Sequence, residues 1–271
     1  TLGEPKFTTT ADGAKIAAYH AGPKDGETVI LLASLGRSVS DFNALVSSLN
    51  SQGYHTISVN MRGVGKSKFA PKQSNLNLFD LAKDVHLAIM PDADREKPVI
   101  LIGHAFGNRL ARAYASAYPQ SIKALVLVAA GGSQKLDPSQ KVTQALGNSF
   151  EWKMWPPKRY REIQYAFFAD THKPPNSWKR GWYKKAAKLQ VMASQTTPLP
   201  TWHAGDGKSP ILVLQAANDR IAPAKTTSQV LLNDFPKRVQ IVEIENAGHA
   251  LLPEQAEAIS DAVIQFLQHL Q

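Results

Sequence analysis

The sequence predicts an α/β fold in which helices cover both faces of a mostly parallel, eight-stranded sheet. Short apolar runs alternate along most of the chain with segments whose apolar residues recur at helical spacing. Most of these runs are apolar throughout, as expected of strands that are buried on both faces. With 271 residues, of which 43% are hydrophobic, the chain is long enough to bury one large core.

The individual elements follow from local patterns. A hairpin is expected to turn at Asp12-Gly13, a dipeptide that favours tight turns. Asn77 is expected to cap a helix, with Asp80 completing a capping box three residues later. The other expected helices are 42–49, the segment after residue 105, and two that start at Pro223 and Pro253. The expected strands are 6–10, 14–20, 28–33, 54–60, 98–102, 124–130, 211–215 and 239–244.

The alternation of strands and helices breaks once, between about residues 132 and 208. This stretch is too long for a loop and predicts a helical cap, residues 132–208, on a core domain of residues 1–131 and 209–271. It is rich in aromatic and basic residues. We expect its rings to divide between cap core and pocket wall, with the cations outside. It holds all five tryptophans of the chain, Trp152, Trp155, Trp178, Trp182 and Trp202.

A strand, a sharp turn and a helix are predicted around Gly103-His104-Ala105-Phe106-Gly107. The pattern differs at one residue from G-x-S-x-G, the nucleophile elbow of α/β-hydrolases. In that turn the central side chain points out of the sheet, and the following helix directs its positive N-terminus at the site. A methyl group cannot attack a carbonyl carbon, so Ala105 marks the nucleophile position without supplying a nucleophile. Two explanations stay open: a native alanine, and an engineered serine-to-alanine change.

The chain resembles the α/β-hydrolase family over nearly its full length. Family members place nucleophile, acid and histidine in that order, and the resemblance implies Asp219 as the acid and His249 as the base. Asp206 is a weaker candidate for the acid. The turn Arg62-Gly63-Val64-Gly65-Lys66-Ser67 matches a further family motif. In such a site the carboxylate fixes the imidazole in one tautomer, and the imidazole accepts the proton of the nucleophile.

Several residues are expected to surround a substrate. The backbone N–H groups of Leu35 and Phe106 can form an oxyanion hole, because this function needs no particular side chain. Arg37 could bind an anionic group of the substrate or pair with an acceptor of the protein itself. Ser34 could replace the missing nucleophile, although a hydrogen-bonding role in its loop is favoured. The remaining candidates for substrate contact are His104, Trp152 and Trp155.

Three functions are compatible with these residues. The favoured one is a hydrolase-family protein for a small or medium apolar ester, lactone or related carbonyl compound, with hydrolysis impaired by Ala105. The second is an enzyme in which His249 and Asp219 act as a general base without a covalent step, as in lyases or cofactor-independent oxygenases of this fold. The third is a binding protein that keeps the pocket and has lost the chemistry.

Composition narrows the remaining possibilities. The absence of cysteine excludes disulfides, cysteine-ligated zinc and thiol catalysis, and we expect no metal and no cofactor. The segment ending in Gly65-Lys66-Ser67 lacks the first glycine of a P-loop, since Asn60 occupies that position. The net charge of +9 suits an acidic ligand or surface, but nucleic-acid and membrane-surface binding are disfavoured. Because the chain begins at Thr1, export after removal of a signal peptide is slightly favoured. The sequence does not predict an oligomeric state.

Overall fold

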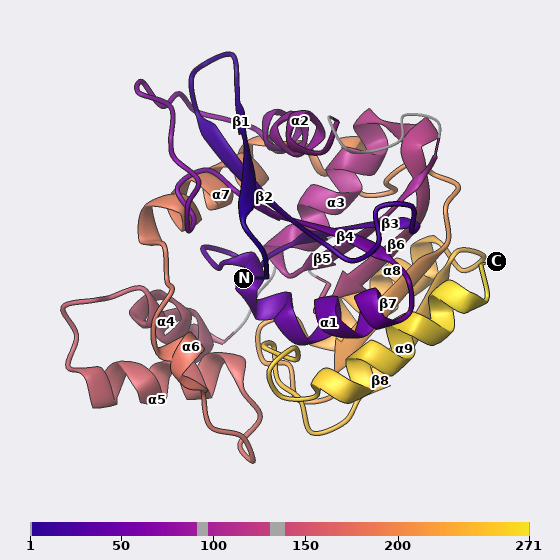
Figure 1. Cartoon of the computed structure of the whole chain (residues 1–271). Helices are drawn as coiled ribbons and strands as arrows, with labels where there is room; N and C mark the ends of the chain where they lie inside the picture. Colours follow the sequence, from indigo (N-terminus) through magenta and orange to yellow (C-terminus); the bar gives the residue numbers. More distant parts are fainter. Residues whose placement is uncertain (1, 91–96, 131–138, 271) are drawn as a thin grey trace.

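The computed structural model describes residues 2–90, 97–130 and 139–270. Its central element is an eight-stranded sheet with the order β1-β2-β4-β3-β5-β6-β7-β8 (Figure 1). Strand β2 runs antiparallel to both of its neighbours, and the remaining pairs are parallel. The predicted fold class is therefore confirmed. The strands are β1 Pro5–Thr9, β2 Lys15–Ala21, β3 Thr28–Leu32, β4 His55–Asn60, β5 Val99–His104, β6 Ile122–Val128, β7 Ile211–Ala216 and β8 Val239–Ile244.

Helices cover both faces of this sheet because the central strands β3, β5, β6 and β7 carry apolar side chains on both sides. One face packs against α2, α3 and α8, and the other packs against α1 and α9 (Figure 1). Two predicted helix starts are wrong by a few residues. Pro223 precedes a short 3-10 turn rather than α8, and Pro253 lies in the turns before α9. The helices are α1 Asn43–Ser51, α2 Leu78–Ile89, α3 Phe106–Ala117, α8 Ser228–Asp234 and α9 Ala256–Gln268.

The start of α2 shows how a local signal fixes an element. The Asn77 side chain accepts hydrogen bonds from the N–H groups of Phe79 and Asp80, and the Asp80 carboxylate accepts from the Asn77 N–H. The expected capping box is thus present, and it satisfies donors that a helix cannot pair internally. Another such donor, the Leu78 N–H, is bound by the hydroxyl of Thr197.

A helical segment lies between β6 and β7, in the region where a cap is predicted. It is described from Ser139 onward, and α4, α5 and α6 lie together beside the sheet (Figure 1). Its apolar core includes Trp178 and Trp182 and also contacts Ile221 and Ala250 from the core domain. The packing therefore reaches the loops after β7 and β8. The helices are α4 Gln140–Ser149, α5 Pro156–Phe167, α6 Asn176–Lys179 and α7 Lys184–Thr196.

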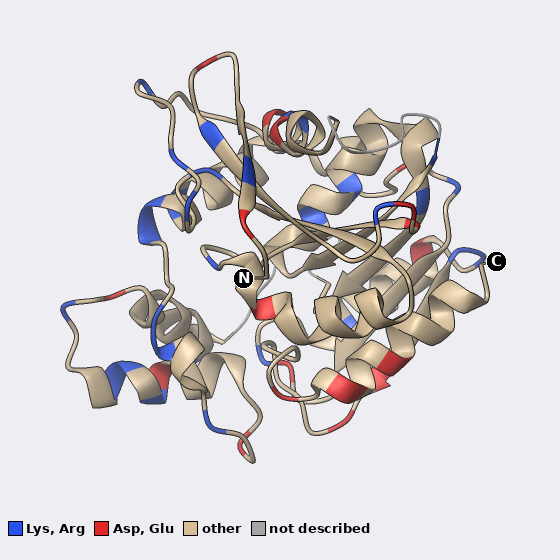
Figure 2. Cartoon of the chain, in the orientation of Figure 1, with Lys and Arg blue, Asp and Glu red and all other residues tan. Residues whose placement is uncertain are grey.

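Charge is distributed unevenly over these elements. Lys and Arg positions recur along α5 and α7, whereas α9 carries Asp and Glu positions (Figure 2). Within the described residues, no helix is both long and apolar enough to cross a membrane.

Candidate active site

The turn between β5 and α3 holds Ala105 in a strained backbone conformation, with φ 49° and ψ −107°. Such positive φ values are unfavourable for residues other than glycine and persist only where surrounding packing imposes them. The two flanking glycines supply this packing. A Cβ atom at Gly103 would overlap the backbone of Gly107, and one at Gly107 would overlap the carbonyl oxygen of Leu32. The Ala105 N–H also donates to the carbonyl of Val128, at 2.9 Å.

We expect Gly107→Ala to lower the free energy of unfolding by about 1–3 kcal/mol, because the added methyl group must displace the backbone at the end of β3. The corresponding drop in Tm, about 2–4 °C per kcal/mol, can be measured by calorimetry. Gly147→Ala in α4 is the matched control, since a Cβ there meets open space and a helical alanine is favoured over glycine. Equal Tm changes in the two variants would contradict close packing at Gly107.

Asp219 and His249 form a buried pair on the loops that follow β7 and β8. The imidazole Nδ1 lies 2.8 Å from the Asp219 Oδ2 atom and 3.1 Å from Oδ1. Since a carboxylate only accepts, Nδ1 donates, and the lone pair of a neutral His249 is placed on Nε2. The structure thus brings together the two residues that the sequence suggested as acid and base. Asp206 is elsewhere, paired with Arg238 and Ser209.

The Asp219 carboxylate stays ionised despite its burial. Burial alone raises the pKa of this group, but the His249 ring and two backbone N–H groups outweigh it and hold the pKa below its ordinary value. Those donors are Ile221, at 2.9 Å, and Ala222, at 2.7 Å, both to Oδ1. An ionised carboxylate in a fixed position orients the imidazole and stabilises its protonated form.

The His249 loop is held in place by the end of α5. The Ala250 N–H donates to the carbonyl of Phe167, at 2.7 Å, and a Cβ at Gly248 would lie 2.6 Å from the same oxygen. The Glu254 carboxylate accepts from the N–H groups of Gly248 and Ala169, at 2.9 and 2.8 Å. The helical segment therefore fixes the position of the candidate base as well as covering it.

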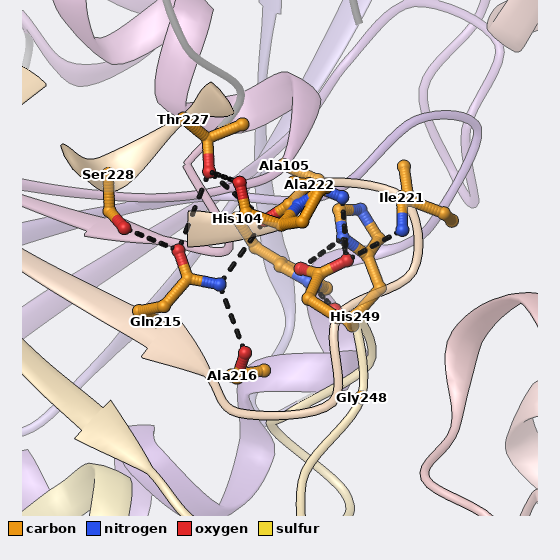
Figure 3. A network of polar contacts seen from close by, with 12 residues as sticks. His104, Ala105, Gln215, Ala216, Ile221, Ala222, Thr227, Ser228, Gly248 and His249 are labelled. Carbon is orange, nitrogen blue, oxygen red and sulfur yellow. Dashed lines mark hydrogen bonds and ion pairs between the residues drawn. The ribbon is translucent and has the colours of Figure 1, made fainter. Parts of the chain in front are cut away.

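His104 was expected to contact substrate, but it does not line the cavity beside Ala105. Its side chain is fully buried, and Nε2 donates to the backbone carbonyl of His249, at 2.8 Å (Figure 3). Burial, reinforced by the nearby His249 ring, lowers the pKa of His104 to about 3. His104 is therefore a neutral support beneath the His249 loop.

A cavity of about 220 Å³ opens above the elbow. Ala105 and His249 both line it, as do Ser34, Leu35 and Phe106. Its remaining walls are mainly apolar. Leu146, Phe150 and Phe167 come from the helical segment, and Ile221 lies in the loop after β7. Among the described residues, no group of three or more His, Asp or Glu side chains is placed to hold a metal ion.

Two backbone donors at this cavity are free to bind a ligand oxygen. The N–H groups of Leu35 and Phe106 make no hydrogen bond with any other described residue. Phe106 is the first residue of α3, where N–H groups lack intrahelical partners. The two residues suggested as an oxyanion hole thus lie at the same cavity as Ala105.

Of the two roles suggested for Arg37, the structure shows the pairing with acceptors of the protein itself. Arg37 is buried and forms a bidentate ion pair with Asp41, at 2.7 and 2.9 Å. It also donates to the carbonyls of Ser177, Arg180 and Gly181 and stacks on Trp178 and Trp182. Every part of the guanidinium is engaged by the protein, and Arg37 does not line the cavity.

The tryptophans also depart from expectation. Trp152 and Trp155 are 53% and 71% exposed, and neither lines the cavity. Trp178 and Trp182 lie in the core of the helical segment, which agrees with the expectation that some of these rings form the core of the cap. The aromatic part of the pocket wall comes instead from phenylalanines, Phe106, Phe150 and Phe167.

One charged residue at the cavity, Arg109, was not among the site residues expected from the sequence. Arg109 lies one turn after Ala105 on α3 and lines the cavity. Its spacing of four residues from the elbow places it on the same side of the helix, a signal that was available in the sequence.

Comparison with known proteins agrees with this geometry. The family model described as alpha/beta hydrolase fold matches residues 27–174, and a model described as TAP-like protein matches residues 176–271. The chain therefore belongs to the α/β-hydrolase fold family.

Individual relatives are distant hydrolases. A protein of Variovorax paradoxus that carries the provisional name carbamate hydrolase RutD is 25% identical, over 91% of this chain and 93% of its own. Lipase 1 of Psychrobacter immobilis is 22% identical, over 95% and 82%. Among solved structures, the enol-lactonase of Burkholderia xenovorans superimposes with a TM-score of 0.75 at 19% identity, over 97% and 100%. The chain is thus related to esterase- and lipase-like hydrolases.

Proposed function

We propose that the cavity binds a small or medium-sized ester, lactone or related carbonyl compound, and that this chain lacks the covalent step of serine hydrolases. The observation that carries the proposal is the intact Asp219–His249 pair at the same cavity as the Ala105 methyl group. A nucleophile needs a lone pair and a proton that a base can remove, and a methyl group offers neither. No acyl-enzyme forms at position 105.

The remaining groups support a direct attack by water. Nε2 of His249 removes a proton from water while the water oxygen bonds to the carbonyl carbon and the carbonyl electrons move to oxygen. The N–H groups of Leu35 and Phe106 stabilise this oxyanion. When the carbonyl re-forms, the alkoxide leaves and takes the proton from the imidazolium. The Asp219 carboxylate stabilises the imidazolium between these steps.

A second candidate function uses the same base on the ligand itself. The cavity retains an oriented, buried His–Asp pair without a nucleophile at position 105, which suits removal of a proton from carbon or oxygen of a bound substrate. The third alternative is a binding protein with no turnover. Products distinguish the three: acid plus alcohol for hydrolysis, a rearranged or cleaved carbon skeleton for the second, and unchanged ligand for the third.

The proposal is tested with a panel of short esters and lactones. We expect slow turnover above the uncatalysed rate, by at most about 10³–10⁴-fold, since oxyanion binding and proximity survive loss of a nucleophile. His249→Gln should lower kcat/KM by about 100-fold or more. His269→Gln is the matched control, because His269 is exposed at the end of α9. Equal turnover in wild type and His249→Gln would overturn a hydrolytic role for this site.

A further inference from the structure

We propose that Arg109 is a carboxylate-binding residue and that the ligand of this cavity is an acidic carbonyl compound. In such a ligand, a carboxylate lies a few bonds from the ester, lactone or ketone group. This inference rests on the proposed function in one respect, the placement of the carbonyl at Ala105. It adds the substrate class, which neither the family nor the relatives supply.

Arg109 stands out because its guanidinium has no acceptor among the residues that the structure describes. It is half-buried in the first turns of α3, yet among the described residues it makes no hydrogen bond, ion pair or ring contact. The other half-buried and buried arginines among the described residues differ from Arg109 in their contacts. Each of these has a carboxylate, amide or carbonyl acceptor: Arg37, Arg62, Arg112, Arg159, Arg220 and Arg238.

Burial without a partner is unfavourable for a cation. Desolvation lowers the pKa of Arg109, and no neighbouring carboxylate offsets this effect. Among the described residues, no Asp or Glu side chain lines the cavity. An incoming carboxylate would therefore meet a partly desolvated guanidinium without displacing a protein partner, and could accept two parallel hydrogen bonds from it.

The position of Arg109 limits the shape of the ligand. Ala105 and Arg109 both line this cavity, so one short ligand can contact the elbow and the guanidinium together. Ser194 and Gln195 of α7 are the other polar side chains beside Ser34 and His249 at this cavity. Phe150, Phe167 and Leu146 would enclose the apolar linker. A monoester of a short dicarboxylic acid has this arrangement of groups.

The test compares two esters that differ only in charge. Binding of monomethyl glutarate and dimethyl glutarate is measured by calorimetry for wild type, Arg109→Met, Arg109→Lys and the control Arg161→Met. Arg161 is an exposed arginine on α5. We expect wild type to prefer the monoacid by at least about tenfold, which is 1.4 kcal/mol. Arg109→Met should remove this preference, Arg109→Lys should retain part of it, and Arg161→Met should retain all of it.

The outcomes separate this inference from the proposed function. No preference for the monoacid in wild type, or the same preference in Arg109→Met, would overturn a role of Arg109 in carboxylate binding. His249-dependent hydrolysis of the neutral diester without any acid preference would overturn this inference alone. An Arg109-dependent acid preference without turnover of either ester would support it and overturn the hydrolytic function. Circular dichroism checks that each variant is folded. If Arg109→Met does not fold, a reduced preference of Arg109→Lys for the monoacid still tests the inference.

Discussion

Replacing Ala105 with serine is expected to raise ester turnover by at least about 100-fold. The new hydroxyl would extend from a turn that already has the strained geometry of a nucleophile elbow. His249, oriented by Asp219, lines the same cavity, and the N–H groups of Leu35 and Phe106 are free. In serine hydrolases the nucleophile and its histidine act as a unit, and loss of either costs about 10⁶-fold in kcat. A gain of about 100-fold is therefore much smaller than the effect on kcat that a fully functional pair of nucleophile and histidine would have.

Kinetics and mass spectrometry check this prediction together. Ala105→Ser should show a burst of alcohol product and a covalent acyl adduct at residue 105, as expected of a two-step mechanism. The double variant Ala105→Ser/His249→Gln should lose the gain, because the hydroxyl then has no base. A well-folded Ala105→Ser protein without any gain on a broad ester panel would favour general-base chemistry on the ligand or binding without turnover.

The elbow explains why this exchange should be tolerated. The conformation of Ala105 is set by the close backbone contacts of Gly103 and Gly107 and by the hydrogen bond to Val128, none of which involves the side chain at 105. Strain of this kind costs about 1–3 kcal/mol and is already present with alanine. Adding an oxygen atom toward a cavity of about 220 Å³ displaces no packed neighbour.

The sequence predicted the features that depend on local pattern. All eight strands were predicted. Strands β3, β5, β6 and β7 are mainly apolar runs, whereas β1 and β2 flank the turn signal Asp12-Gly13. The resemblance to the α/β-hydrolase family implied Asp219 and His249 as acid and base, and the structure places them after β7 and β8, which are adjacent parallel strands. The capping box of α2 is also local, within four residues of the chain.

Features that depend on distant packing could not be predicted. Arg37 donates to the carbonyls of Ser177, Arg180 and Gly181, about 140 residues further along the chain, so the sequence around Arg37 did not identify these partners. Trp155 is exposed although it is large and apolar, because it caps the start of α5 outside the core of that segment. Periodicity identifies the buried face of a long helix but does not specify which ring of a short, irregular segment reaches a pocket.

His104 leads to a further expectation, that stability falls as the pH decreases below about 6.5. Its pKa is about 3 in the folded protein and 6.5 in its ordinary state, so between these values the unfolded chain binds one more proton. Stability therefore rises with pH in this window. For one such group the expected loss between pH 7.5 and 5 is about 2 kcal/mol. Asp219 contributes at lower pH. Because its pKa is lowered in the folded protein, the stability that its ionised form contributes is lost only when the pH falls below the ordinary range of a carboxyl group.

The variant His104→Gln isolates this contribution. A glutamine side chain can donate to the His249 carbonyl and does not titrate, so urea unfolding of the variant should depend less steeply on pH between 7.5 and 5. The expected difference in slope is about 1.4 kcal/mol per pH unit near pH 5. His269→Gln should keep the wild-type slope, because His269 is exposed. If His104→Gln and wild type lose stability in parallel, the proton taken up on unfolding belongs to another group, and His104 is not the neutral support beneath the His249 loop.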